Sequence, residues 1–280
     1  MGCILSTFQS PLSGWGAIKK VLPLQSWGAT TRPKFVLFGS SIVQYSYYEG
    51  WGATLSHLYA RKADIVLRGY AAWNSRRALQ VLDKIFPKNA IEQPSLVIVY
   101  FGGNDCTHPF PSGLGPHVPL EEYVENMRKI AIHIMSLSDK TRIILLSNPP
   151  INEAQIKINI DDFGNPMRTN ETSRIYSEAC LNMCREMKIK AIDLWSAIQK
   201  IDDWRDVCFV DGVHLSNKGS EIVTKEILNV IEEAEWKPSL YWKLMPAEFG
   251  EDSPYDMVSL DGKININFSD VPFPDGVEWP

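Results

Sequence analysis

Short apolar segments alternate with helix-length segments from residue 32 onward, and this alternation restricts the fold more than any other feature of the sequence. Strands are expected over residues 35–38, 64–67, 96–101, 142–146 and 189–193. Helices are expected over residues 51–62, 75–86, 120–137, 169–187 and 217–234. Strands separated by helices form parallel sheets that are covered on both faces. The pattern therefore predicts an α/β fold, a three-layer α/β/α sandwich with a flavodoxin-like sheet of five parallel strands.

The chain of 280 residues is long enough for one large α/β domain with a well-buried core. We predict three parts: an N-terminal extension over residues 1–31, one large α/β domain over residues 32–257, and a C-terminal tail over residues 258–280. Residues 1–48 contain no Asp or Glu, and the tail is rich in Asp and Pro. Both ends thus differ in composition from the region between them.

The first six residues, MGCILS, match the M-G-x-x-x-[ST] pattern of N-myristoylation at Gly2, and the adjacent Cys3 is a candidate for palmitoylation. Two acyl chains would anchor the protein stably to a membrane. The Ser-rich, acid-poor composition also suits an organellar transit peptide, although Arg is scarce. A disordered extension without any targeting role is the third interpretation. The sequence leaves all three open.

The formal net charge of -5 is mildly acidic, which argues against nucleic acid as a partner. No stretch approaches the eighteen or so apolar residues that a membrane-spanning helix requires. The five cysteines are odd in number and have neither zinc-binding nor C-x-x-C spacing. Reduced thiols in a cytoplasmic protein are the simplest interpretation, with no metal and no cofactor expected.

A sharp turn is predicted where the first strand ends at Gly39, because Ser40, Ser41 and an apolar-periodic segment follow directly. A serine at such a turn lies at the carboxyl edge of the sheet, where α/β proteins place their chemistry. The alternative is an ordinary helix N-cap, in which a serine oxygen accepts from free backbone N–H groups. A base and an oxyanion site elsewhere in the chain would favour the catalytic interpretation.

Three polar residues could supply those groups. His214 could act as a general base, with Asp211 one turn away to hold its other ring nitrogen. The alternative for this pair is a capping arrangement before the last helix. Asn104 follows the third strand and two glycines, where it could donate to an oxyanion or simply form a turn.

Four short stretches occur at strand ends and in a late loop: GSSI at 39–42, RGYAAWN at 68–74, GGND at 102–105 and DGVH at 211–214. Together they resemble the GDSL, or SGNH-hydrolase, family of esterases and lipases. The likeness is greatest to the plant branch related to isoamyl-acetate-hydrolysing esterases. It covers residues 32–232 in the family core, and the plant branch also shares the tail to about residue 257.

The resemblance implies a role for each motif. Ser41 matches the nucleophile, His214 the general base and Asp211 the residue that orients it. Asn104 matches the asparagine whose amide donates to the oxyanion, with Gly103 beside it allowing close approach of the backbone. The backbone N–H groups of Ser41 and Ala72 would be the other donors.

Two positions depart from the family pattern. Ser40 replaces the usual aspartate, and we expect its side chain to cap the following helix. Ala72 replaces the glycine that supplies the second oxyanion donor; it keeps the N–H but adds a methyl group and disfavours positive φ. Losing one oxyanion donor costs on the order of 100-fold in rate. Ala72 therefore either reshapes the pocket toward a particular substrate or is a tolerated substitution.

The resemblance implies a serine esterase that cleaves short, acetyl-type esters of a small-molecule alcohol through an acyl-enzyme. Two alternatives remain. An acyltransferase would use the same acyl-enzyme with a bound alcohol or amine in place of water. A non-catalytic binding protein would result if Ala72 has disabled the oxyanion site.

Overall fold

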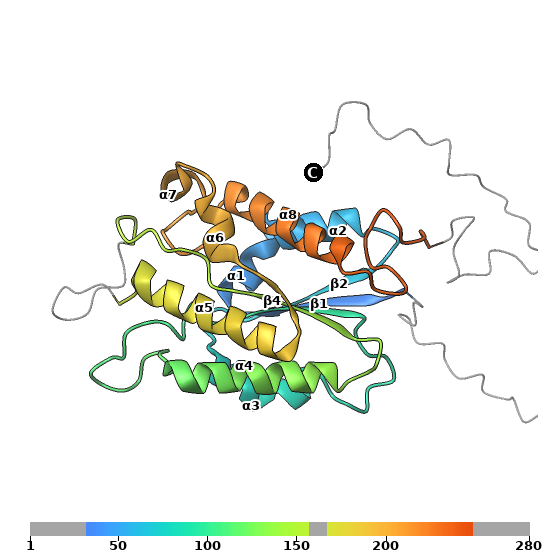
Figure 1. Ribbon diagram of the computed structural model, residues 1–280, viewed down its shortest axis with the longest axis horizontal. Helices are drawn as coiled ribbons and strands as arrows, with labels where there is room; N and C mark the ends of the chain where they lie inside the picture. Colours follow the sequence, from blue (N-terminus) through green and yellow to red (C-terminus); the bar gives the residue numbers. More distant parts are fainter. Residues whose placement is uncertain (1–31, 157–166, 249–280) are drawn as a thin grey trace, which may run out of the picture. The chain divides into compact units, whose positions relative to one another are not determined.

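One parallel sheet forms the centre of the protein (Figure 1). The structure is a computed structural model that describes residues 32–156 and 167–248. Within those ranges the sheet has five strands in the order β2-β1-β3-β4-β5. They are β1 (Lys34–Gly39), β2 (Asp64–Gly69), β3 (Leu96–Tyr100), β4 (Arg142–Leu146) and β5 (Lys190–Ile192). This is the flavodoxin-like order, and the direction in which strands are added reverses at β1. The predicted fold class is confirmed.

Helices cover both faces of the sheet (Figure 1). On one face lie α2 (Trp51–Leu58), α6 (Leu194–Gln199) and α8 (Asn217–Glu233). On the other lie α3 (Ser75–Ile85), α4 (Leu120–Met135) and α5 (Asn170–Met187). Three short helices complete the described chain: α1 (Ser41–Gln44), η1 (Tyr45–Tyr47) and α7 (Trp204–Val207). The predicted long helices are all present, whereas α6 and α7 were not predicted.

The side chains of β1 show why a continuous apolar run forms a central strand. Phe35 and Leu37 pack into the core on the α2 and α8 side, while Val36 and Phe38 pack into the core on the α3 and α4 side. All four are almost completely buried. Successive side chains of a strand point to opposite faces, so a strand that is covered on both faces has no polar position.

Several predictions concern residues outside the described ranges. The candidate acylation sites Gly2 and Cys3 and the predicted domain boundary at residue 257 are among them.

Residues 234–248, which follow α8, pack against α2 and the loop after it. There the Tyr59 hydroxyl donates to the Leu240 carbonyl at 2.8 Å, and Lys62 Nζ donates to the Trp242 carbonyl at 2.6 Å. None of the helices in the described part of the chain is long and apolar enough to cross a membrane.

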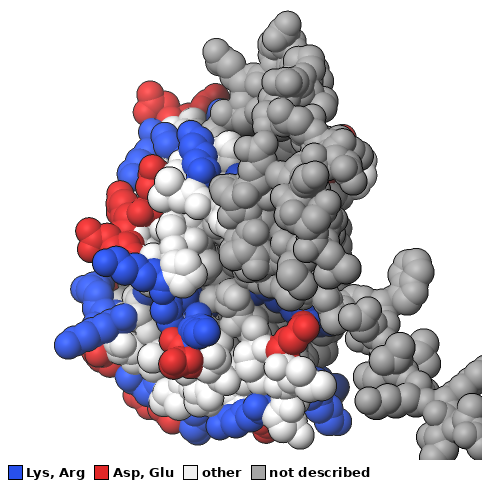
Figure 2. All heavy atoms as spheres, turned by 90° about the vertical axis from the view of Figure 1, so that its right-hand side faces the viewer, with Lys and Arg blue, Asp and Glu red and all other residues white. Residues whose placement is uncertain are grey.

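The amino-terminal edge of the sheet carries charges of both signs. Figure 2 shows this side, and basic and acidic side chains are interspersed on the described surface that is visible there. Ion pairs at this edge join Arg32 to Asp64 at 2.6 Å and Lys34 to Glu92. The carboxyl ends of the strands, with the loops that follow them, lie at the opposite edge.

Phe38 should be a major contributor to stability. Its ring is fully buried and packs edge-to-face on Phe86 and Phe101, with centroids 5.2 and 5.0 Å away. Phe38→Ala should lower the free energy of unfolding by about 3–5 kcal/mol, because it removes apolar contact and leaves a cavity. Urea denaturation measures this change. Ile91→Ala, at a fully exposed position, is the control and should change it by less than about 0.5 kcal/mol. A loss below about 1 kcal/mol at Phe38 would contradict this packing.

Candidate active site

The turn between β1 and α1 places Ser41 at the carboxyl edge of the sheet. Gly39 allows this turn because a Cβ atom there would lie 2.4 Å from the Tyr100 carbonyl oxygen and 2.5 Å from Val43 Cγ2. The backbone N–H of Ser40 donates to that same Tyr100 oxygen at 3.3 Å. Ser41 is thus the first residue of α1, held against the end of β3.

The prediction that the Ser40 side chain caps α1 is wrong. Ser40 occupies the N-cap position, but its side chain is buried and makes no capping hydrogen bond. Its backbone carbonyl instead accepts from the N–H groups of Val43 and Gln44 at 3.1 and 2.9 Å. The side chain does not cap because the backbone hydrogen bonds of Ser40 fix the residue with its side chain buried in the interior.

His214 links Ser41 to Asp211. Its Nε2 atom lies 2.9 Å from Ser41 Oγ, and its Nδ1 atom lies 2.6 Å from Asp211 Oδ2. Ser41 and His214 are 173 positions apart in the sequence. The structure therefore brings together the three residues that the sequence singled out, in the arrangement of a nucleophile, a base and a carboxylate that orients the base.

The turn that carries Asp211 and His214 holds both side chains in place. Asp211 Oδ1 accepts from the backbone N–H groups of Val213 and His214 at 3.0 and 2.8 Å. Gly212 has a φ of 87° in this turn, and a Cβ atom there would lie 2.5 Å from the Asn152 carbonyl oxygen. The cap of α8 is Ser216, which accepts from the Gly219 N–H, so Asp211 does not cap that helix.

The environment of Asp211 keeps its carboxylate charged. Partial burial raises its pKa, but the hydrogen bond to the His214 ring and those from the backbone N–H groups of His214 and Val213 outweigh it. The net effect lowers the pKa to about 2. An ionised carboxylate accepts the Nδ1 proton of His214, which leaves the Nε2 lone pair directed at Ser41.

Ala72 follows β2 with a left-handed backbone, at a φ of 63°. This conformation costs a non-glycine residue on the order of 1 kcal/mol. The preceding N–H, that of Ala71, donates to Gln44 Oε1 at 2.7 Å and so ties this loop to α1. Within the described chain the backbone N–H groups of Ser41 and Ala72 have no hydrogen-bond acceptor, so both are available to a ligand.

Asn104 lies after β3 with its side-chain amide held at both ends. Nδ2 donates to the Trp73 carbonyl oxygen at 2.7 Å, and Oδ1 accepts from the guanidinium of Arg168 at 2.7 Å. An amide nitrogen carries two protons, so one remains for a further acceptor. Gly103 has a structural role beyond the predicted one: a Cβ atom there would lie 2.5 Å from the Tyr100 hydroxyl.

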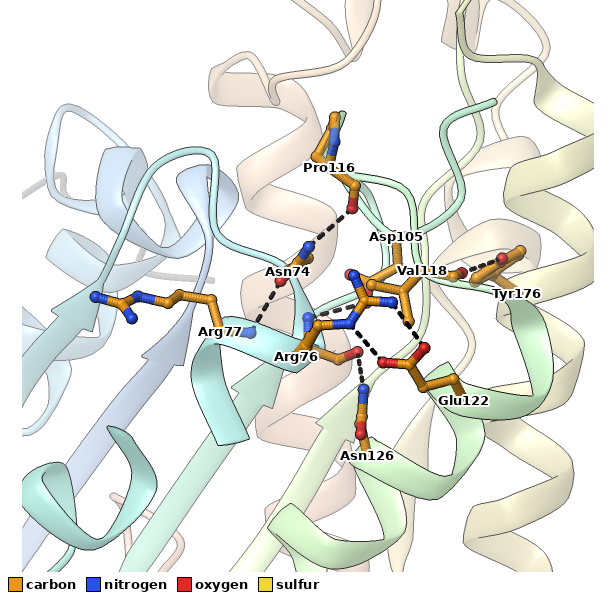
Figure 3. A network of polar contacts seen from close by, with 10 residues as sticks. Asn74, Arg76, Arg77, Asp105, Pro116, Val118, Glu122, Asn126 and Tyr176 are labelled. Carbon is orange, nitrogen blue, oxygen red and sulfur yellow. Dashed lines mark hydrogen bonds and ion pairs between the residues drawn. The ribbon is translucent and has the colours of Figure 1, made fainter. Parts of the chain in front are cut away.

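A buried polar network joins the loops that carry Ala72 and Asn104 (Figure 3). Asp105 Oδ1 accepts from the Ser75 N–H at 2.9 Å, and the Ser75 hydroxyl accepts from Asn126 Nδ2 at 3.1 Å. Asn74 caps α3 and also donates to the Pro116 carbonyl at 2.9 Å. Burial raises the pKa of Asp105 to about 6, against the hydrogen bonds from Ser75. The network fixes the spacing between the two loops.

An aromatic ring packs against the candidate base: the Tyr45 ring meets the His214 ring edge-to-face with centroids 5.2 Å apart. The Tyr70 and Trp73 rings stack at 4.1 Å and pack against the core that contains Phe38. In the ranges 32–156 and 167–248 no group of three or more His, Cys, Asp or Glu side chains could hold a metal ion. The chemistry that the site offers is that of a polarised serine beside N–H donors.

Sequence reasoning did not find Arg168. The polar stretch from residue 152 to 168 resembles an insertion, and nothing in its composition points to the loop after β3. The one local signal in the sequence is that Arg168 directly precedes Thr169, the N-cap of α5. The start of that helix fixes the backbone position of Arg168.

Comparisons with known proteins identify the family of the chain. The sequence model described as "GDSL-like Lipase/Acylhydrolase" matches residues 35–227. The rice protein "GDSL esterase/lipase WDL1" is 61% identical over 253 residues, which make up 90% of this chain and 97% of the rice protein. The bovine "Isoamyl acetate-hydrolyzing esterase 1 homolog" is 35% identical over 204 residues, or 71% of this chain and 82% of its own.

A solved structure shares the fold. The crystal structure of the acetyl xylan esterase AlAXEase superposes with a TM-score of 0.56 at 17% identity, over 71% of this chain and 99% of that one. The likeness to the plant branch that the motifs suggested is confirmed by the rice relative. The chain belongs to the GDSL-like lipase/acylhydrolase family and is a carboxylic ester hydrolase.

Proposed function

We propose that the protein is a serine esterase that hydrolyses short, acetyl-type acyl esters through an acyl-enzyme on Ser41. The observation that carries this proposal is the pair of contacts at His214: Nε2 to Ser41 Oγ at 2.9 Å and Nδ1 to Asp211 Oδ2 at 2.6 Å. A serine hydroxyl is a weak nucleophile until a base within hydrogen-bond reach removes its proton.

In the first half of the reaction, Ser41 Oγ attacks the acyl carbonyl while His214 Nε2 takes the hydroxyl proton. Asp211, ionised at neutral pH, stabilises the imidazolium that forms. The tetrahedral intermediate then collapses, the bond to the alcohol oxygen breaks, and His214 returns the proton to that oxygen. The alcohol leaves and the acyl group remains on Ser41.

Three donors would bind the oxyanion of that intermediate: the backbone N–H groups of Ser41 and Ala72 and the free Nδ2 proton of Asn104. They come from the loops after β1, β2 and β3, which are neighbours in the sheet. Donors fixed in advance stabilise developing charge without reorganising during the reaction. In the second half, His214 activates a water that releases the acid from Ser41 by the same steps.

Two similarities support short acyl groups. The bovine relative is named for the hydrolysis of an acetate ester, and the superposed crystal structure is that of an acetyl xylan esterase. In both names the acyl part is a two-carbon unit. We carry this preference over to the present chain, whose alcohol partner we leave unassigned. An added alcohol that captures the acyl group faster than water does would reveal a transferase.

Ser41→Ala should abolish both turnover and covalent labelling by a fluorophosphonate probe. The probe reacts with an activated serine, and removing the nucleophile of such a site costs about 10⁴-fold or more in kcat. Ser40→Ala is the matched control and should still be labelled, because His214 contacts Ser41. Labelling is read by intact-protein mass. A wild-type protein that takes up no probe would overturn the proposal.

Ala72→Gly should change which acyl chains are accepted. Ala72 is exposed, and its methyl group sits on the residue whose N–H would bind the oxyanion. Removing one methyl from a pocket changes discrimination by about 10-fold or more. We expect the ratio of kcat/KM for acetyl and butyryl esters to shift by about that factor. Ala71→Gly, whose N–H is bound to Gln44, should leave the ratio unchanged. An unchanged ratio in Ala72→Gly would show a tolerated substitution.

Asp211→Asn should lower kcat by as much as about 10⁴-fold, because a neutral amide favours the wrong imidazole tautomer.

The effect of Asp211→Asn on stability should depend on pH. The pKa of Asp211 is depressed in the folded protein to about 2, so its stabilising contribution is complete above the ordinary value of about 4. That contribution is lost as the pH falls from about 4 to about 2.

The measurement is urea denaturation of wild type and Asp211→Asn from pH 8 to pH 2. The difference between the two should be constant above about pH 5 and should shrink below about pH 4. Asp202→Asn, at an exposed position, is the control for the loss of a surface carboxylate. A difference that already shrinks between pH 8 and pH 6 would contradict the low pKa of Asp211.

A further inference from the structure

The guanidinium of Arg168 contacts the loop after β3 at two points. NH1 donates to the Gly103 carbonyl oxygen at 2.6 Å, and NH2 donates to Asn104 Oδ1 at 2.7 Å. Both acceptors belong to the segment that would present an amide to the oxyanion. Arg168 therefore donates both to the amide oxygen of Asn104 and to the backbone carbonyl of the preceding residue.

We propose that Arg168 is a positioning residue for ester hydrolysis, which holds the Asn104 amide so that its nitrogen, and not its oxygen, faces the oxyanion. This inference rests on the proposed function. Arg168 itself need not touch the substrate. Its effect would pass through Asn104, because the two contacts described above end on the Asn104 side chain and on the residue before it.

The need for such a residue follows from the chemistry of a primary amide. Its two ends differ little in shape, and a half-turn of the side chain would exchange a donor for an acceptor. An oxygen facing the oxyanion would repel it. Arg168 can only donate and the Trp73 carbonyl can only accept, so both contacts would be lost if Asn104 turned over. Together they leave one orientation.

The backbone around Arg168 is anchored well enough to hold a guanidinium in place. Thr169 caps α5 through a reciprocal capping box with Thr172. The Asn170 side chain accepts from the Ile151 N–H at 3.0 Å, and the Met167 carbonyl accepts from the His108 N–H at 2.8 Å. The residues on both sides of Arg168 are therefore tied to the loops after β3 and β4.

The charge of Arg168 adds to its geometry. Hydrogen bonds from a charged donor are roughly twice as strong as neutral ones, and a bound amide oxygen makes the amide N–H groups better donors. The charge is felt in the interior under this loop. Burial raises the pKa of the Cys106 thiol to about 12, and the positive charge of Arg168 opposes that rise. Lys could supply a charge but could not reproduce the planar fork.

The first experiment measures kcat and KM of the full-length protein for p-nitrophenyl acetate. Arg168→Met keeps an unbranched stem but removes the guanidinium and its donors, and it should lower kcat on the order of 10- to 100-fold, with KM changed less than about threefold. The kcat of Arg168→Lys should lie between those of wild type and Arg168→Met. Arg174→Met is the matched control, since Arg174 lies in α5 and pairs at the surface with Glu171 and Glu178. It should have wild-type kcat.

A double-mutant cycle with Asn104→Ala tests whether Arg168 acts through the amide. In the Asn104→Ala background, Arg168→Met should cost less than about threefold in kcat, because the amide that it orients is gone. Full additivity would overturn the inference and show a purely structural role. If Arg168→Met does not fold, the same cycle is run with Arg168→Lys, and additivity there has the same meaning.

Ser41→Ala separates the two kinds of failure. If Ser41→Ala keeps wild-type activity, the proposed function itself is wrong. If Ser41→Ala is inactive while Arg168→Met keeps wild-type kcat, only the positioning role is wrong. Loss of activity in both, with the cycle non-additive, supports the inference.

Discussion

Two backbone hydrogen bonds at the end of β1 set where the three loops that carry Ser41, Ala72 and Asn104 begin. The Gly39 carbonyl accepts from the Tyr70 N–H at 2.8 Å, and the next N–H, of Ser40, donates to the Tyr100 carbonyl at 3.3 Å. These contacts join the ends of β1, β2 and β3 at one level, so the loops that carry Ser41, Ala72 and Asn104 start side by side. A side chain at Gly39 would separate them. The reversal of strand order at β1 is what creates this meeting point.

The sequence predicted what depends on local pattern. Apolar runs bounded by turn residues gave the strands, periodic segments gave the long helices, and four motifs singled out Ser41, Ala72, Asn104, Asp211 and His214 as candidates. What it did not predict depends on contacts between distant segments. The short helix α7 places Trp204 in a cluster that includes Ile198 of α6 and Ile222 of α8, and Arg168 meets Asn104 across 64 positions. No periodicity records such pairs. The Ser40 cap failed for a related reason, since strand pairing overrides a local side-chain preference.

The two halves of the candidate site are built differently. Asp211 and His214 share one turn, whose carboxylate also binds the backbone of that turn, so they are oriented relative to each other by local contacts. The proposed oxyanion donors come from three loops, and contacts of Asp105, Arg168 and the carbonyl of Trp73 hold two of these loops together. Sequence motifs therefore describe the first half almost completely and the second half only in outline. Ala72 belongs to the second half, where a methyl group is added to an already left-handed residue.

A single contact connects these halves through side chains that react: Ser41 Oγ to His214 Nε2. The turn that carries His214 is partly open to solvent, with the side chain of Asp211 51% exposed. Such loops open at a lower free energy than a buried sheet does. The rate of ester turnover would then depend on whether the turn that carries Asp211 and His214 is in place, even while the rest of the fold is intact. Mild heating or dilute denaturant would inactivate the enzyme reversibly while its sheet stays intact, so that activity is lost at a lower temperature than the one at which the fold melts.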